Sequence, residues 1–189
     1  MRHVISALVI NEPGVLAGVA GMFSARGFNI DSLVVGRTDD PNLSRMTIVV
    51  NADDVTLDQV RKQLAKLVAT VEVRDFAGTA YIERDLALVN VNCNAEKRRE
   101  VVEIVELFRG KVVDVSPESV MVELAGTEDK LEAFIDLMKP YGIESLARTG
   151  VIAMPRGAQV TKDKTAGDEG PKKRIRSLEG PAGVALPPS

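Results

Sequence analysis

The sequence predicts an α+β protein with two tandem βαββαβ units, residues 1–84 and 85–156, and a tail at 157–189. Apolar runs of strand length alternate with stretches whose apolar residues repeat at helical spacing, and this order occurs twice before it stops after Arg156. The 189 residues are 45% hydrophobic and 27% charged, which is typical of a globular protein and sufficient for two small cores.

The first unit follows the order strand, helix, hairpin, helix, strand. Gly27 after Arg26 is a typical helix stop, and Thr56 begins a capping box with Gln59 at the start of the second helix. Gly78 is expected to form a bulge or bend inside the last strand. The predicted elements are a strand at 3–10, a helix at 15–26, strands at 28–37 and 44–51, a helix at 56–68 and a strand at 70–84.

The second unit repeats this order. Asn94 and Thr127 are predicted to cap its two helices, which end at Gly110 and Pro140. Its predicted strands are at 86–93, 111–115, 119–124 and 143–153. We expect each unit to form a ferredoxin-like sandwich, with two helices on one sheet face and the other face polar or covered by a partner.

Composition limits the classes of function. A net charge of −3 argues against a nucleic-acid surface over the whole chain, and the basic run 172–176 in the predicted disordered tail is expected to be solvated. No long apolar run predicts a membrane span or a secretion signal, so we expect a cytoplasmic protein. Cys93 is the only cysteine and His3 is the only histidine. This excludes an internal disulfide, a Cys/His zinc site and a His-based triad within one chain. Asp39 and Asp40 are a metal pair or, as we favour, a solvated turn.

The turn between the first strand and the first helix is the candidate ligand site. Pro13 and Gly14 predict a tight turn, after which the first helical amides attract an anion. The side-chain oxygen of Asn11 can accept hydrogen bonds from an ammonium group. These groups suit an amino-acid zwitterion, although the same residues also fit an ordinary strand-to-helix turn.

Other sites fit the sequence less well. The small residues Gly14, Gly18 and Gly21 do not match the dinucleotide pattern, and no Walker sequence is present. The first loop lacks the Arg that a phosphatase on this fold would need, and aromatic residues at 4% are too few for an RNA-binding sheet. We therefore predict no catalytic residues and no metal ligands.

Several long stretches resemble the small regulatory subunit family of acetohydroxyacid synthase, also called acetolactate synthase. The resemblance extends from about residue 1 to Arg156 and implies that residues 1–84 form an ACT domain and residues 85–156 the family's second domain. It rests on residues 11–16, 22–33, 38–47, 108–115 and 123–127, which begin Asn-Glu-Pro-Gly-Val-Leu, Met-Phe-Ser-Ala-Arg-Gly, Thr-Asp-Asp-Pro-Asn-Leu, Phe-Arg-Gly-Lys-Val-Val and Glu-Leu-Ala-Gly-Thr.

The resemblance implies a non-catalytic subunit that activates a large catalytic subunit and confers feedback inhibition by valine. Thiamine diphosphate, Mg and FAD would belong to the catalytic subunit. The effector would lie between two ACT domains of a homodimer. From the charge and the lack of a long apolar run, we expect no nucleic-acid or membrane partner. The implied effector-binding residues are Asn11, Gly14, Val15, Leu16, Asn29 and Ile30.

Two points stay open at this stage. Many relatives carry Arg or another polar residue where this chain has Gly18, so valine, leucine and isoleucine all remain candidate effectors. A free-standing ACT-domain amino-acid sensor that regulates another protein would use the same pocket and differ only in its partner.

Overall fold

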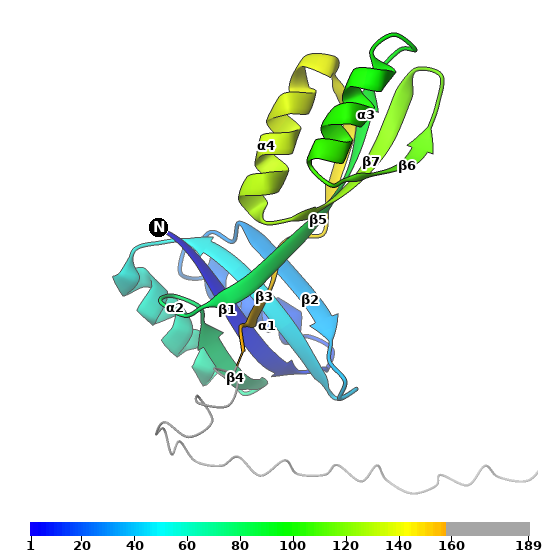
Figure 1. The fold of residues 1–189 in the computed structure, drawn as a ribbon. Coiled ribbons are helices and arrows are strands. Elements are labelled where there is room, and N and C mark those ends of the chain that lie inside the picture. Colours follow the sequence, from blue (N-terminus) through cyan, green and yellow to red (C-terminus); the bar gives the residue numbers. More distant parts are fainter. Residues whose placement is uncertain (158–189) are drawn as a thin grey trace, which may run out of the picture. The chain divides into compact units, whose positions relative to one another are not determined.

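The computed structural model describes residues 1–157, so the predictions for 158–189, including the basic run 172–176, lie outside the described residues. Within 1–157 the chain forms two antiparallel sheets, each with two helices on one face (Figure 1). This confirms the predicted pair of βαββαβ units. None of the helices in this range is long and apolar enough to cross a membrane.

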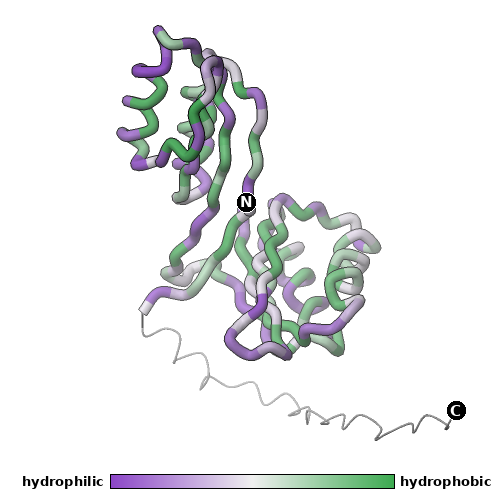
Figure 2. The backbone as a smooth tube through the Cα atoms, turned by 90° about the vertical axis from the view of Figure 1, so that its right-hand side faces the viewer, coloured by the Kyte–Doolittle hydropathy of each residue, from purple (hydrophilic) through white to green (hydrophobic). Residues whose placement is uncertain are grey.

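The first sheet has the strand order β2-β3-β1-β4. Helices α1 and α2 pack on one face of it, around buried side chains such as Ile5, Phe23, Ile48 and Leu64. Apolar residues therefore gather on the inner faces of these elements (Figure 2). The elements are β1 (Arg2–Ile10), α1 (Val15–Ser24), β2 (Ser32–Arg37), β3 (Leu43–Asn51), α2 (Asp54–Lys66) and β4 (Thr70–Asp75).

The second sheet has the order β6-β7-β5-β8, and a last strand, β9, pairs with the first part of β5. Helices α3 and α4 cover its core, which includes Val89, Val105, Val122 and Phe134. The elements are β5 (Tyr81–Asn92), α3 (Arg98–Leu107), β6 (Lys111–Val115), β7 (Ser119–Gly126), α4 (Glu128–Met138), a 3-10 turn (Lys139–Tyr141), β8 (Ile143–Arg148) and β9 (Ile152–Pro155).

Two of the predicted strands were wrong because each contains a turn. Gly78 has φ of 68° and lies in a turn that separates β4 from β5, and Gly150 has φ of 85° and separates β8 from β9. Both glycines adopt a left-handed conformation that a continuous strand does not contain. The predicted boundary between Arg84 and Asp85 consequently falls inside β5.

Two of the predicted helix caps differ from the structure, and the third is confirmed in its position only. Asp53, not Thr56, caps α2, because its carboxylate accepts the Thr56 amide at 2.7 Å. Hydrogen bonds from the Thr56 side chain and from its amide lower the pKa of Asp53. Asn94 accepts the Lys97 amide in the turn before α3, whose N-cap is Lys97 itself. Thr127 occupies the N-cap of α4 but makes no side-chain cap hydrogen bond.

The helix stop after α3 also differs in detail. Gly27, after α1, adopts the left-handed conformation expected of a helix stop, with φ of 68°. After α3 this conformation belongs to Arg109, with φ of 54°, and not to Gly110. Gly110 is instead required for space, since an added Cβ would lie 3.0 Å from Val105 Cγ1 and 3.3 Å from the Glu123 carbonyl.

The chain itself covers part of the open face of the first sheet. Strands β5 and β9 pair from Tyr81 to Arg84 and bring buried apolar side chains onto this face. Since the helices occupy the opposite face, this small core completes a second layer over β1 and β3. It consists of Val4, Val49, Phe76, Val151 and Ala153, with Tyr81 packed against it.

Truncation of one side chain tests this layer. Val151 is 1% exposed, so Val151→Ala should lower the free energy of unfolding by about 2 kcal/mol through lost burial and a residual cavity. Urea denaturation followed by circular dichroism measures this difference. The adjacent Ile152 is 54% exposed, and Ile152→Ala should change stability by less than about 0.5 kcal/mol. Equal effects from both substitutions would contradict the assigned layer.

Candidate functional site

The turn after β1 is anchored to the β2–β3 connection. The Asn11 amide donates to the Asn42 carbonyl at 2.7 Å, and Asn11 Nδ2 donates to the Pro41 carbonyl at 3.0 Å. Within residues 1–157 the side-chain oxygen of Asn11 accepts no hydrogen bond. The exposed Asn11 is thus held in place with an acceptor still available for a ligand.

Gly14 is the N-cap of α1 and has φ of 86°. A side chain at this position would be strained, although an added Cβ would meet nothing within 4 Å. The backbone carbonyl of Gly14 accepts the Gly18 amide, and the Val15 amide lies 3.4 Å from the Glu12 carbonyl. No side chain caps α1, and its first turn contains no acidic residue. This helix end therefore keeps the positive potential that favours an anion.

A shallow hollow of about 350 Å³ lies beside the start of α1. Val15 is half-buried in its wall, whereas the Leu16 side chain points away from the core and is 46% exposed. Thr70 Oγ1 is buried with no hydrogen-bond partner among the described residues. The hollow is lined by Pro13, Gly14, Val15, Gly18 and Val19 from one side and residues 67–70 from the other.

Asn29 and Ile30 lie in the connection between α1 and β2. Asn29 is exposed and donates from Nδ2 to Asp31 Oδ1 at 2.9 Å, while Asn51 Nδ2 donates to the other Asp31 oxygen at 2.9 Å. Ile30 is half-buried against the first core. Asp31 therefore fixes this segment against the end of β3.

The six candidate residues form two separate groups within one chain. Asn11 follows Ile10, at the end of β1, whereas the Asp31 amide donates to the Val49 carbonyl opposite Val4, near the start of β1. At about 3.3 Å per strand residue these groups are roughly 20 Å apart. One chain thus brings Asn11, Gly14, Val15 and Leu16 together but not with Asn29 and Ile30.

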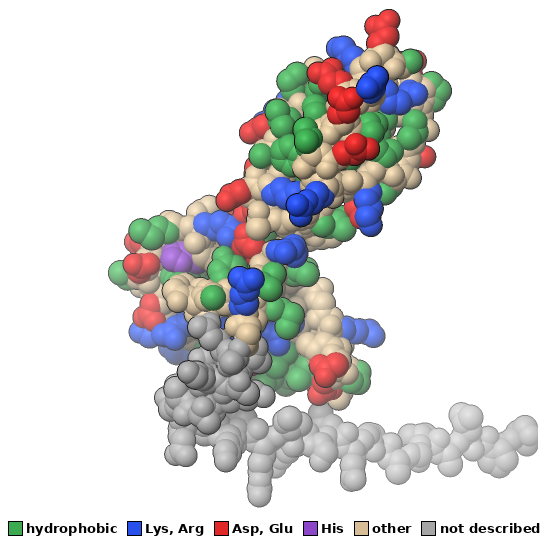
Figure 3. Space-filling view, viewed as in Figure 1, with side chains coloured by type: hydrophobic (Ala, Val, Ile, Leu, Met, Phe, Trp, Pro, Cys, Tyr) green, Lys and Arg blue, Asp and Glu red, His purple; other side chains and the backbone are tan. Residues whose placement is uncertain are grey.

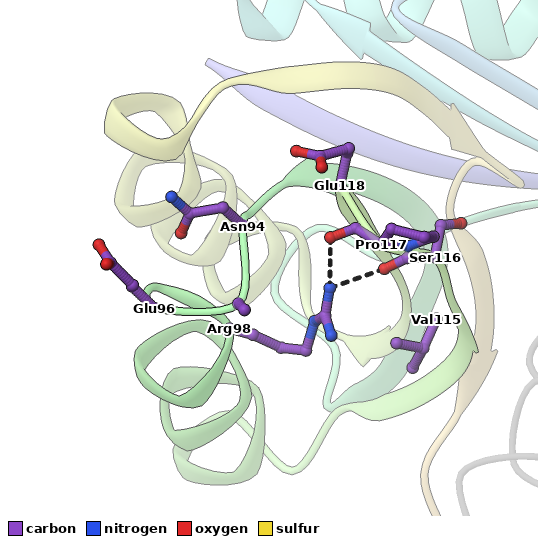
Figure 4. Close-up of a pocket in the computed structure, with 8 residues that line it drawn as sticks. Asn94, Glu96, Arg98, Val115, Ser116, Pro117 and Glu118 are labelled. Atoms are coloured by element: carbon purple, nitrogen blue, oxygen red, sulfur yellow. Dashed lines mark hydrogen bonds between the residues drawn. The ribbon is translucent and has the colours of Figure 1, made fainter.

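A larger, open hollow of about 820 Å³ lies in the second unit, where we predicted no site (Figure 4). Arg98 Nη2 donates to the Ser116 carbonyl at 2.8 Å and to the Pro117 carbonyl at 2.6 Å. The guanidinium thus joins the start of α3 to the β6–β7 turn. These carbonyls both bind Nη2, so we assign Arg98 a structural role. Its Nε is buried with no hydrogen-bond partner among the described residues.

The Asp39-Asp40 pair belongs to a turn. Asp40 Oδ1 accepts the Asn42 amide at 2.9 Å and Asn42 Nδ2 at 3.1 Å, as in the solvated turn that we favoured. Across residues 1–157 no group of three His, Cys, Asp or Glu side chains has a geometry suited to a metal ion. Acidic and basic side chains are interspersed on the face drawn in Figure 3.

Comparison with known proteins places both units in one family. Residues 5–72 match the family model described as AHAS small subunit-like ACT domain, and residues 84–157 match the model described as small subunit of acetolactate synthase. The chain is 54% identical over 157 residues to a probable acetolactate synthase small subunit of Archaeoglobus fulgidus, covering 83% of this chain and 98% of that protein.

Two further relatives agree. The acetolactate synthase small subunit of Mycolicibacterium smegmatis is 47% identical over 155 residues, which cover 82% of this chain and 91% of that protein. The crystal structure of the small subunit from Thermotoga maritima superimposes with a TM-score of 0.76 at 43% identity, covering 83% of this chain and 98% of that one. With both units matched and relatives aligned over nearly their whole length, the chain belongs to the family of acetolactate synthase small subunits, the regulatory subunits that carry an ACT domain.

Proposed function

We propose that this chain activates the thiamine-diphosphate-dependent catalytic subunit of acetolactate synthase and confers feedback inhibition by valine. The observation that carries the proposal is the pair of half-sites on the ACT domain. One half offers an open helix start and the Asn11 oxygen, and the other offers Asn29 beside the apolar Ile30. Together these groups match the ammonium, carboxylate and aliphatic parts of a branched-chain amino acid.

A homodimer would complete the site. If two α1 helices packed antiparallel across a two-fold axis, the start of one helix would lie near the end of the other, where Asn29 follows. Added Cβ atoms at Gly18 and Gly21 would meet nothing within 4 Å, so this face of α1 leaves room for a second backbone. The free space over Gly14 also suits a contact supplied by another chain or by the ligand.

Each residue has a distinct role in this proposal. Asn11 and Asn29 would bind the charged groups of valine, and the first amides of α1, at Val15 and Leu16, would add positive potential for the carboxylate. The half-exposed Leu16 and Ile30 would contact its aliphatic side chain. Valine can then inhibit by binding one arrangement of the dimer more tightly than another, with a coupling of about 1–3 kcal/mol.

The proposal assigns all catalysis to the large subunit. Thiamine diphosphate, Mg and FAD would be held there, and this chain would act in the cytoplasm through protein contacts and valine alone. Binding to the catalytic subunit also distinguishes this role from that of a free-standing amino-acid sensor, which would use the same pocket with a different partner.

Reconstitution with the catalytic subunit tests the proposal. Mixing the two chains should raise the rate of acetolactate formation, and valine should reverse this increase. Gly14→Asp adds a negative charge and a side chain where the carboxylate of valine would bind. The valine concentration for half-inhibition should therefore rise at least about tenfold, equivalent to about 1.4 kcal/mol. If both the unsubstituted chain and Gly14→Asp stimulate the enzyme but valine inhibits neither, the proposed activation would stand and the effector site would be refuted.

A pair of glycine substitutions separates backbone strain from ligand contact. Gly14→Ala should lower the free energy of unfolding by about 1 kcal/mol without any ligand, because Ala is strained at a φ of 86°. Gly18→Ala, one turn later in α1, should not introduce this backbone strain within the chain, because a helical backbone suits Ala. Urea denaturation of both variants measures these changes. A stabilised Gly14→Ala variant would show that this turn does not impose the left-handed conformation.

A further inference from the structure

The turn between β8 and β9 contacts the first strand of the ACT hairpin. The Val151 amide donates to Ser32 Oγ at 3.2 Å. Gly150, with φ of 85°, lies so close to β2 that an added Cβ would be 2.6 Å from Ser32 Oγ and 2.8 Å from Val34 Cγ2. Only a glycine fits both this backbone conformation and this distance.

Asp85 holds the turn from the other side. It is 2% exposed, and its Oδ1 accepts the Gly150 amide at 3.1 Å and the Thr149 hydroxyl at 3.2 Å. Its Oδ2 accepts Nε and Nη2 of Arg148 at 2.8 and 2.6 Å. Both oxygens of this buried carboxylate are therefore satisfied, which fixes the turn to the middle of β5.

Charged side chains add further contacts around this turn, and we call the turn and these contacts the junction. Arg148 also pairs with Glu132 and lies 3.9 Å from Glu128, while Arg2 donates to Glu128 at 2.6 Å and to Glu83 at 3.0 Å. Burial alone would lower the pKa of Arg148, but its hydrogen bonds to Asp85 and Glu132 outweigh burial and raise it. These contacts join β1 of the ACT domain to β5, β8 and α4.

The position of Ser32 gives the junction its significance. Ser32 directly follows Asn29, Ile30 and Asp31, the segment that forms the second half of the proposed effector site. A shift of that segment on binding valine would therefore reach the contact between Ser32 and Val151 through one peptide unit. The same turn is bonded to Asp85 in the central strand of the second sheet.

We propose that the turn at 149–151, held by Asp85 and docked on Ser32, couples the effector segment of the ACT domain to the second domain. Ser32, Asp85 and Gly150 are positioning residues in this inference, which rests on the proposed regulation by valine. Coupling requires that both sites favour different arrangements of one shared element, and this turn is the shared element.

Gly150→Ala tests the coupling in the reconstituted enzyme. The added methyl group should push the turn away from Ser32, while the residues proposed to bind valine stay unchanged. Calorimetric titration of valine into the regulatory chain should give a Kd within about threefold of the unsubstituted protein. The valine concentration for half-inhibition of acetolactate formation should rise at least about tenfold, within the usual range of coupling between sites.

Gly142→Ala is the matched control. Gly142 also has a positive φ, 94°, but its added Cβ would lie 3.5 Å from Asn92 Cβ, which is ordinary contact away from the junction. This variant should therefore carry the backbone strain and keep inhibition by valine. Ser32→Ala removes the acceptor of the Val151 amide without adding bulk, and it should also weaken inhibition by valine. It provides the test of the coupling if Gly150→Ala does not fold.

The outcomes distinguish this inference from the proposed function. If the unsubstituted chain is neither stimulatory nor sensitive to valine, the proposed function fails. If the unsubstituted enzyme is inhibited and both Gly150→Ala and Ser32→Ala are inhibited equally well, the coupling role is refuted. Parallel loss of valine binding and inhibition would also refute it, since the turn would then act on the effector site itself.

Discussion

The structure depends on the continuity of β5. This strand runs for 12 residues from Tyr81 to Asn92, and its two parts serve different layers. Its first part pairs with β9 over the open face of the ACT sheet, and its second part is the centre of the second sheet between β7 and β8. One continuous strand therefore belongs to both layers, with its pairing partner changing between Arg84 and Asp85.

The two parts of β5 meet at Asp85, a carboxylate that is only 2% exposed. Ala87, Val89 and Val91 enter the second core, whereas Tyr81 packs on the layer that contains Val151. A buried carboxylate is unfavourable unless it is paired, and Arg148, Thr149 and Gly150 supply the partners. At Asp85, β5 thus passes from the layer over the ACT sheet into the second sheet. The β8–β9 turn is hydrogen-bonded to β5 at this residue.

The spacing of apolar residues predicted the elements well where a helix follows a strand, because the spacing changes there. It predicted them poorly where one strand follows another. Helices α1, α2, α3 and α4 each present an apolar face at helical spacing between apolar runs of strand length, so their existence was clear. At Gly78 and Gly150 a strand is followed by another strand of the same period, and the sequence on both sides of each turn is alike. Nothing local distinguished a bulge from a turn there, because the outcome depends on pairing with distant strands. The N-cap at Asp53 was missed for a related reason, since Thr56 offered an equally plausible cap.

For the candidate site too, the sequence could predict the chemistry of single residues but not the distances between segments far apart in the chain. Local chemistry predicted Gly14 as the turn residue, and the structure gives it the left-handed backbone of such a turn. The acceptor role of Asn11 stays a prediction, since its side-chain hydrogen bond within residues 1–157 is a donation from Nδ2 to the Pro41 carbonyl. The distance to Asn29 could not be read from the sequence, because it depends on how α1 crosses the sheet. A site divided in this way has a thermodynamic consequence if a second copy completes it. A two-fold interface would create two equal sites, each with one half from either chain. Valine would then bind only the associated form. It would stabilise that arrangement by a free energy that grows with the logarithm of its concentration relative to its Kd, and an effector can act through subunit placement in this way.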